Sequence, residues 1–198
     1  MPVQNRESLV YLTHDEWKRL LGVIDKLHRR NRHWRYVRDR AIFVTAYTYA
    51  LRASEVGLLR VADIDLNRER IFIRRLKGSI SGEWPLLPDV TRVLKRWLRE
   101  REALGWGQRS ALFLSQQGLP ISRTMLHVLM RKYGKLAKLP PHKRHFHVLK
   151  HTRVMHLLEQ THDIVGTQHW VGHKNITNTM HYVHLVGFHR EEFARQLT

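Results

Sequence analysis

Apolar residues recur at helical spacing along most of the chain, and one stretch breaks this pattern. Trp17, Leu20, Leu21 and Ile24 repeat at intervals of three and four residues, as on the buried face of a helix. In RIFIRRLKGSISGEWPLL, residues 70–87, isoleucines instead alternate with charged residues before two glycines interrupt the chain. This alternation predicts a β-hairpin. The sequence therefore predicts a mostly α fold (α+β class) with one small antiparallel sheet.

Capping and breaking signals divide the chain. Thr13, with Glu16 three residues later, forms a capping box that predicts a first helix from residue 13, after an N-terminal arm of residues 1–12. A short strand and turn are predicted in ALFLSQQGLPIS, residues 111–122. Further helices are predicted at 36–51, within 54–65, and at 89–104, 122–138, 147–160, 163–171, 175–184 and 187–196.

The charge of the chain favours a polyanionic partner. It carries 35 Lys and Arg against 17 Asp and Glu over 198 residues, a net charge of +18. Nucleic acid is the leading candidate, because basic side chains release counterions from its phosphates. A membrane surface is disfavoured, since no apolar run reaches the roughly 18 residues of a spanning helix. A basic soluble or ribosome-associated protein remains an alternative.

Two further features restrict the class of protein. The chain has no cysteine, which excludes disulfides, zinc thiolates and a thiol nucleophile. The N-terminal MPVQNRESLVYLTHDEW lacks the apolar region of a secretory signal. We therefore expect a cytoplasmic protein.

Tyr182 stands in an unusually positive stretch. VGHKNITNTMHYVH, residues 171–184, holds three histidines and a lysine but no carboxylate. A phenol has a free pKa near 10, so it needs a base and a positive field to act as a nucleophile. His147 and Lys150, at i, i+3 spacing, share one helix face. The candidate site residues are Arg52, Lys77, His147, Lys150, His173 and Tyr182.

The order and spacing of these residues resemble the tyrosine recombinase family, which includes the phage integrases. RASE followed by LLRVADID is similar to the family's first arginine motif, with Glu55 in support, and LKGSISGEWPLLP to its lysine hairpin. HVLKHTRVMHLLE and VGHKNITNTMHYVH are similar to its His-x-x-Arg and Gly-His…Tyr motifs. The resemblance runs from about Leu12 to the C-terminus, so residues 13–198 are expected to form the catalytic domain. The layout looks like the short fimbrial phase-switch invertases.

The resemblance implies a site-specific DNA recombinase that works through a 3′-phosphotyrosyl intermediate. Tyr182 would attack the phosphate, Arg52 would clamp it, and His147 would handle the tyrosine proton. His173 would bond a non-bridging oxygen, and Lys77 would protonate the departing 5′ oxygen. The family's chemistry needs no metal, cofactor or ATP. Its members belong to mobile elements and chromosomes, so a bacterial nucleoid location and a homotetramer on double-stranded DNA are expected.

The chain departs from the family at two points. Lys150 stands where the family has its second arginine, and Arg153, one helical turn later, is a candidate to compensate. The first helix begins near Thr13, so we expect no N-terminal core-binding domain. Assembly on DNA or a helper protein then becomes more important. The apolar face of the tail, Phe188, Phe193 and Leu197, is expected to pack either on its own domain or on a neighbouring subunit.

Two other functions remain open. A recombinase homologue impaired by Lys150 would act as a DNA-binding regulator. A catalytic metal site is disfavoured, because the i, i+4 histidine pairs His147/His151 and His169/His173 have almost no carboxylate support. The sequence leaves open the DNA site, the choice among inversion, integration and excision, and whether Tyr182 acts in cis or in trans.

Overall fold

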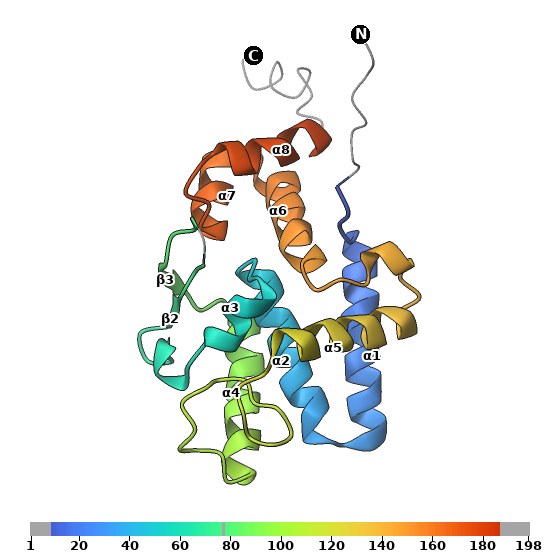
Figure 1. Cartoon of the computed structure of the whole chain (residues 1–198), viewed down its shortest axis with the longest axis vertical. Helices are drawn as coiled ribbons and strands as arrows, with labels where there is room; N and C mark the ends of the chain where they lie inside the picture. The colour runs from blue at the N-terminus through green and yellow to red at the C-terminus, as the bar shows by residue number, and fades with distance from the viewer. Residues whose placement is uncertain (1–8, 77, 187–198) are drawn as a thin grey trace.

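The computed structural model describes residues 9–76 and 78–186. Lys77, the expected last helix at 187–196, and the tail residues Phe188, Phe193 and Leu197 lie outside these ranges. The predicted mostly α fold with a small antiparallel sheet is confirmed (Figure 1). The helices are α1 (His14–Asn31), α2 (Trp34–Thr48), α3 (Ala53–Leu58), α4 (Pro88–Ala103), α5 (Arg123–Leu136), α6 (Val148–Thr161), α7 (Ile164–Val171) and α8 (Thr177–Val186), with short 3-10 turns at Val61–Asp63 and Pro141–Lys143.

Local side-chain bonds set the ends of these helices. The hydroxyl of Thr13 accepts from the amide of Glu16, whose carboxylate accepts from the amide of Thr13 in return, so the predicted capping box is present. The carboxylate of Asp163 caps α7 in the same way. Gly172 ends α7 with a φ of 71°, a left-handed conformation that favours glycine.

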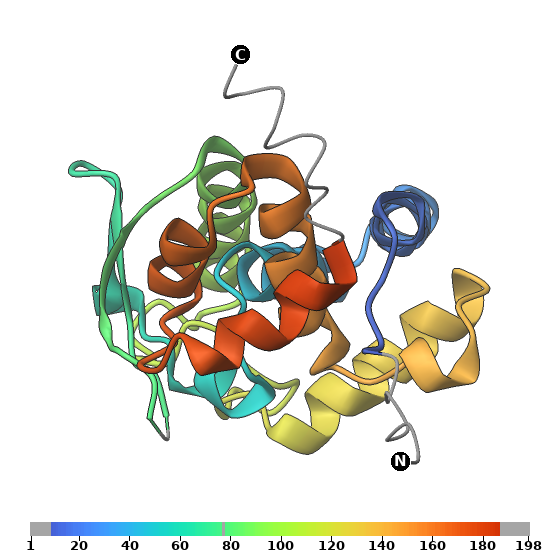
Figure 2. The same cartoon turned by 90° about the horizontal axis from the view of Figure 1, so that it is seen from above.

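Helix α2 forms the centre of the core. Ala41, Ile42 and Phe43 are completely buried, and α2 packs against α1, α4 and α6 (Figure 1). A second apolar cluster lies between α6, α7 and α8, where Val154 and Val171 surround Tyr182. Seen from above, α8 lies across α6 (Figure 2). This cluster therefore fixes the helix that carries Tyr182. None of the described helices is long and apolar enough to cross a membrane.

The sheet is fastened to α7. Its strands β1 (Ile64–Asp65), β2 (Arg70–Ile73) and β3 (Gly82–Pro85) are antiparallel in the order β1-β2-β3. Trp84 of β3 donates its indole N–H to the carbonyl of Trp170, at 2.9 Å. Beyond the turn, Ile80 donates its amide to the carbonyl of Gly172 at 2.9 Å, and Ser79 pairs with His173. The β2–β3 connection therefore lies beside the end of α7.

Of the short strand and turn expected at 111–122, the turn is present, with the amide of Ser115 donating to the carbonyl of Leu119, but the strand does not form. This segment makes only isolated bridges, of which Leu114 to Pro120 is one. Several of its backbone carbonyls instead accept single hydrogen bonds from side chains of other elements. Arg38 donates to the carbonyl of Leu114, and the indole of Trp97 donates to the carbonyl of Leu112. The two arms beside the turn bond each other, as from the amide of Ile121 to the carbonyl of Phe113, but no strand of the described sheet pairs with the segment. The apolar run is therefore buried as a loop that passes through the core.

Candidate active site

Arg52 joins α3 to the β2–β3 hairpin. Its Nη1 donates to Glu55 Oε1 at 2.8 Å, to Ser79 Oγ at 3.0 Å and to the carbonyl of Leu76 at 3.2 Å. All the bonds of this guanidinium within the described residues use Nη1, and its side chain is 38% exposed. The outer edge of the guanidinium is therefore accessible to a ligand.

Arg75 is a second cation of the site, and the sequence analysis missed it. Its side chain is fully buried, with Nη2 donating to the carbonyl of Tyr49 at 2.6 Å and Nη1 lying 3.3 Å from Glu55 Oε2. Burial alone would raise the pKa of Glu55, but the Arg52 amide and the Arg75 charge lower it more. Glu55 therefore stays ionised between two arginines. Nothing in the sequence distinguishes Arg75 from its basic neighbours.

Lys150 extends from α6 toward the same two arginines. It is 7% exposed, and its Nζ has no hydrogen-bond partner within the described residues. Burial first, and then the charges of Arg52 and Arg75, lower the pKa of Lys150 to about 7, although the charge of Glu55 acts in the opposite direction. A buried ammonium without a partner is costly. An anion bound between Arg52 and Lys150 would remove that cost.

His173 completes the positive group. It is 5% exposed, and its Nδ1 lies 3.0 Å from the hydroxyl of Thr179 in α8. Burial, followed by the charges of Lys150, Arg52 and Arg75, lowers the pKa of His173 to about 4. The ring is therefore neutral at pH 7, with its Nε2 available to bond a ligand.

Tyr182 lies against this group and contacts a histidine that the sequence analysis did not assign. Its hydroxyl is 2.7 Å from Nδ1 of His151, and its ring is 6% exposed. Burial raises the pKa of Tyr182 to about 12, with Arg52 opposing the rise. Burial and the charges of His147 and Lys150 lower the pKa of His151 to about 4. The only sequence signal for His151 is its i, i+4 spacing from His147.

Two other residues that the sequence assigned to the site, His147 and Arg153, do not contact Tyr182. His147 is exposed at the start of α6, where its ring contacts those of His145 and His151 but no contact joins it to Tyr182. Arg153 lies over the ring of Tyr47, 5.3 Å from its centroid, away from the group. The structure thus brings together Arg52, Glu55, Lys150, His173 and Tyr182, and adds Arg75 and His151.

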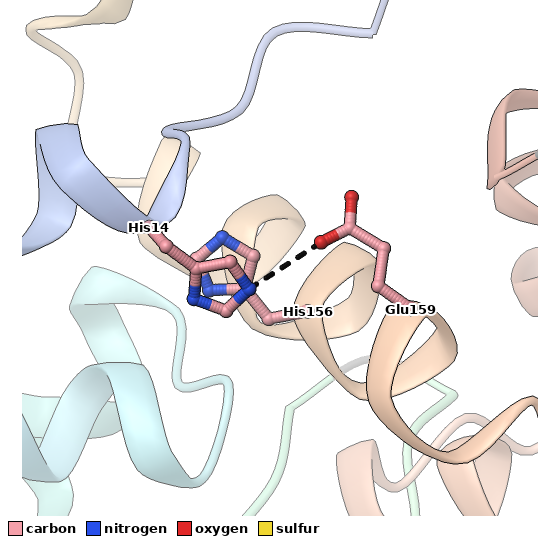
Figure 3. Close-up of side chains that lie close together, drawn as sticks. All are labelled: His14, His156 and Glu159. Atoms are coloured by element: carbon pink, nitrogen blue, oxygen red, sulfur yellow. Dashed lines mark ion pairs between the residues drawn. The ribbon is translucent and has the colours of Figure 1, made fainter.

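One group of three potential metal ligands occurs within the described residues: His14, His156 and Glu159 (Figure 3). The two imidazole rings are stacked at 3.7 Å with 14° between their planes, so their in-plane lone pairs do not converge. Both nitrogens of His156 already have partners, the hydroxyl of Tyr47 and the carbonyl of Leu12. This donor set does not fit a metal ion. It fastens the start of α1 to α6.

Comparison with known proteins decides the family. The family model described as "Phage integrase family" matches residues 10–187. The chain belongs to this family. Three curated relatives agree, and two of them are Type 1 fimbriae regulatory proteins of Escherichia coli K12. FimE is 35% identical to this chain, and the match covers 73% of this chain and 73% of FimE. FimB is 33% identical, and the match covers 87% of this chain and 82% of FimB.

The third relative is the tyrosine recombinase XerC of E. coli O1:K1, which is 33% identical over 75% of this chain and 49% of its own. Three solved structures share the fold. The match to XerA recombinase (TM-score 0.73, 24% identity) covers 99% of this chain and 65% of the XerA chain. The match to XerH bound to its difH substrate (TM-score 0.78, 23% identity) covers 96% of this chain and 55% of the XerH chain.

The third structure, the catalytic domain of bacteriophage HP1 integrase (0.65, 20%), is matched over 95% of both chains. The chain thus spans 65% or less of the two Xer structures, about half of XerC, and nearly all of an isolated catalytic domain. By family and fold it is a tyrosine-type site-specific recombinase.

Proposed function

We propose that this chain cleaves and rejoins a strand of duplex DNA through a covalent bond between Tyr182 and the 3′ phosphate. The observation that carries the proposal is the convergence of Arg52, Lys150 and His173 beside the buried hydroxyl of Tyr182. A phosphodiester resists attack because its oxygens are negative. Fixed cations lower that barrier most when they are already in place.

The geometry suggests a role for each cation. The exposed edge of Arg52 offers a planar fork for two non-bridging oxygens. The ammonium of Lys150, which has no hydrogen-bond partner among the described residues, offers a point charge from the α6 side, and Nε2 of His173 offers a third donor. Glu55 holds Arg52 and pairs with the buried Arg75, and neither Glu55 nor Arg75 meets the phosphate itself. We keep Lys77 as the donor to the departing 5′ oxygen, because it adjoins Leu76, whose carbonyl bonds Arg52.

Two observations support cleavage in cis on double-stranded DNA. The ring of Tyr182 packs on α6 of its own chain, beside the cations that would hold the phosphate. Helix α5 and the residues just after it present exposed basic side chains, as expected for phosphate contacts. These are Arg123, Arg131, Lys132, Lys135 and Lys138. Relatives solved on DNA, such as XerH on difH, are consistent with this partner.

The remaining expectations carry over as parts of the same proposal. Residues 13–198 act as the catalytic domain, and the protein assembles as a homotetramer on DNA, where a helper protein would supply grip on the other face. Its place of action is the bacterial cytoplasm, at the nucleoid.

Covalent trapping tests the proposal. The protein is mixed with nicked duplexes that tile the DNA flanking its own gene, because a nick lets the cleaved fragment diffuse away and prevents resealing. We expect an adduct that survives SDS and disappears on protease treatment. Tyr182→Phe should bind the same duplex without forming it. Tight binding with no adduct from the wild-type chain would overturn the proposal.

The substitution of lysine for arginine at position 150 supports one alternative, a DNA-binding regulator with impaired catalysis. Lysine cannot bond two oxygens at once as arginine does. If this alternative holds, the wild-type chain forms no adduct and Lys150→Arg forms one. If the wild-type chain forms the adduct, the lysine suffices and the regulator alternative fails.

A further inference from the structure

The hydroxyl of Tyr182 lies within hydrogen-bond distance of His151. The hydroxyl oxygen and Nδ1 are 2.7 Å apart, with 5.8 Å between ring centroids. Burial favours the neutral form of both groups at pH 7, because it raises the pKa of Tyr182 to about 12 and lowers that of His151 to about 4. A neutral phenol donates, so Nδ1 accepts and the ring proton lies on Nε2.

His147 does not have this access to Tyr182. It is exposed, it precedes α6, and its described ring contacts are His145 on one side and the edge of His151 on the other, at 5.6 Å between centroids. His151 therefore lies between His147 and Tyr182. Of these two histidines, only His151 touches the atom that would attack.

We propose that His151, and not His147, is the catalytic base that holds Tyr182 and takes its proton. This inference rests on the proposed function. In the forward step the Tyr182 O–H bond breaks and its proton goes to His151 Nδ1, while a Tyr182 O–P bond forms. The bond from phosphorus to the 5′ oxygen breaks, and that oxygen takes a proton from Lys77. In rejoining, each proton returns to its donor.

The arrival of DNA supplies what the free site lacks. In the free protein, burial opposes the protonation of His151 most, and the charges that Lys150 and a protonated His147 would carry oppose it further. A phosphate held by Arg52 and Lys150 brings negative charge to the same place and favours imidazolium. The base thus gains strength only when the substrate is bound, which protects Tyr182 from premature ionisation.

The activity test uses His151→Asn, because its amide oxygen can accept the Tyr182 hydrogen bond at the place of Nδ1 but cannot take the proton. Single-turnover cleavage of the trapping duplex should fall about 10²–10⁴-fold, the usual contribution of a general base. His147→Asn should lose less, and His145→Asn, an exposed neighbour, serves as the control. A duplex with sulfur at the 5′ bridging position, whose leaving group needs no proton, should restore a Lys77→Ala variant but not His151→Asn.

A second readout separates proton transfer from packing. His151→Ala should regain cleavage with added imidazole, which a purely structural role would not allow. His151→Asn cleaving within threefold of wild type would overturn the proposal. So would imidazole failing to rescue a folded His151→Ala variant.

The contact itself is measurable without DNA. In ¹⁵N-histidine spectra of the full chain, Tyr182→Phe should shift the Nδ1 signal of His151 and leave that of His147 nearly unchanged. An unshifted His151 signal would overturn the inference even if the wild type cleaves DNA. A shifted signal in a chain that forms no adduct would instead identify the proposed function as the part that failed.

Discussion

Glu55 holds Arg52 with both of its carboxylate oxygens. Oε1 accepts from Nη1 of Arg52 at 2.8 Å, and Oε2 accepts from the backbone amide of the same residue at 2.8 Å. The carboxylate also lies 3.3 Å from the buried guanidinium of Arg75. It therefore fixes the direction of the proposed phosphate clamp and offsets the charge of the cations around it.

Removing the charge of Glu55 should destabilise the protein. Glu55→Gln keeps the shape but leaves Arg75 buried without a counter-charge, so we expect a loss of about 3–5 kcal/mol in the free energy of unfolding at pH 7. Urea denaturation measures it, with the exposed Glu83→Gln as control. The pKa of Glu55 is lowered in the fold, so its contribution is present above pH 4.5 and is lost as pH falls through the folded value. Equal stability of the two variants would contradict this role.

The buried ammonium of Lys150 should lower the free energy of unfolding of the DNA-free protein. Its pKa is about 7 in the fold against 10.5 ordinarily, so stability falls as pH drops from 10.5 to 7, by about 5 kcal/mol at about 1.4 kcal/mol for each pH unit. We expect Lys150→Met to be more stable than wild type at pH 7, to lose this slope, and to form no DNA adduct. Lys135→Met, exposed on α5, is the control. A destabilised Lys150→Met variant would show that the ammonium has a partner.

Acid should weaken the fold through three histidines, of which His156 and His173 are buried and His151 is half-buried. Burial lowers the pKa values of His151, His156 and His173 to about 4. Their stabilising contribution is present above pH 6.5 and is lost as pH falls toward 4, because only the unfolded chain takes up these protons. Near pH 5 the slope approaches about 4 kcal/mol per pH unit. His156→Gln should reduce the measured slope by about a third, and an unchanged slope would contradict the burial of this ring.

Gly172 should not tolerate a side chain. Its φ is 71°, and an added Cβ would lie 3.0 Å from the carbonyl oxygen of Ile80 and 3.1 Å from Nε of Arg75. Gly105 has a similar φ of 73° but no described atom within 4 Å of the same position. Gly105→Ala should cost about 1–2 kcal/mol from backbone strain alone. Gly172→Ala should cost more and should also slow cleavage, whereas equal costs and full activity would contradict the tight packing of the hairpin on α7.

The helices were predictable because their signals are local. The capping box of Thr13 and Glu16, and the left-handed end at Gly172, depend on residues within one turn. The turn in 111–122 was predicted correctly from its local signals. The strand was not, because an apolar run looks the same in a strand and in a buried loop. Which one forms depends on distant donors such as Arg38 and Trp97, which bond its carbonyls.

The site residues that belong to local motifs were likewise predictable, and those that depend on tertiary packing were not. Motif spacing identified Arg52, Lys150, His173 and Tyr182, and the fold brings them together. His151 and Arg75 were missed because their roles depend on tertiary packing. His151 meets a tyrosine 31 residues away only when α8 lies across α6, and Arg75 acts through carbonyls at the end of α2. A basic residue beside other basic residues carries no sign of such burial.

The role of Tyr182 as the nucleophile can be tested by identifying the residue that becomes joined to DNA. The adduct formed on a nicked duplex is digested with nuclease and trypsin, and tandem mass spectrometry locates the nucleotide on the peptide. We expect a 3′ nucleotide on the phenol of Tyr182 and no such peptide from Tyr182→Phe. A nucleotide on another residue, or an undiminished adduct from the phenylalanine variant, would contradict it.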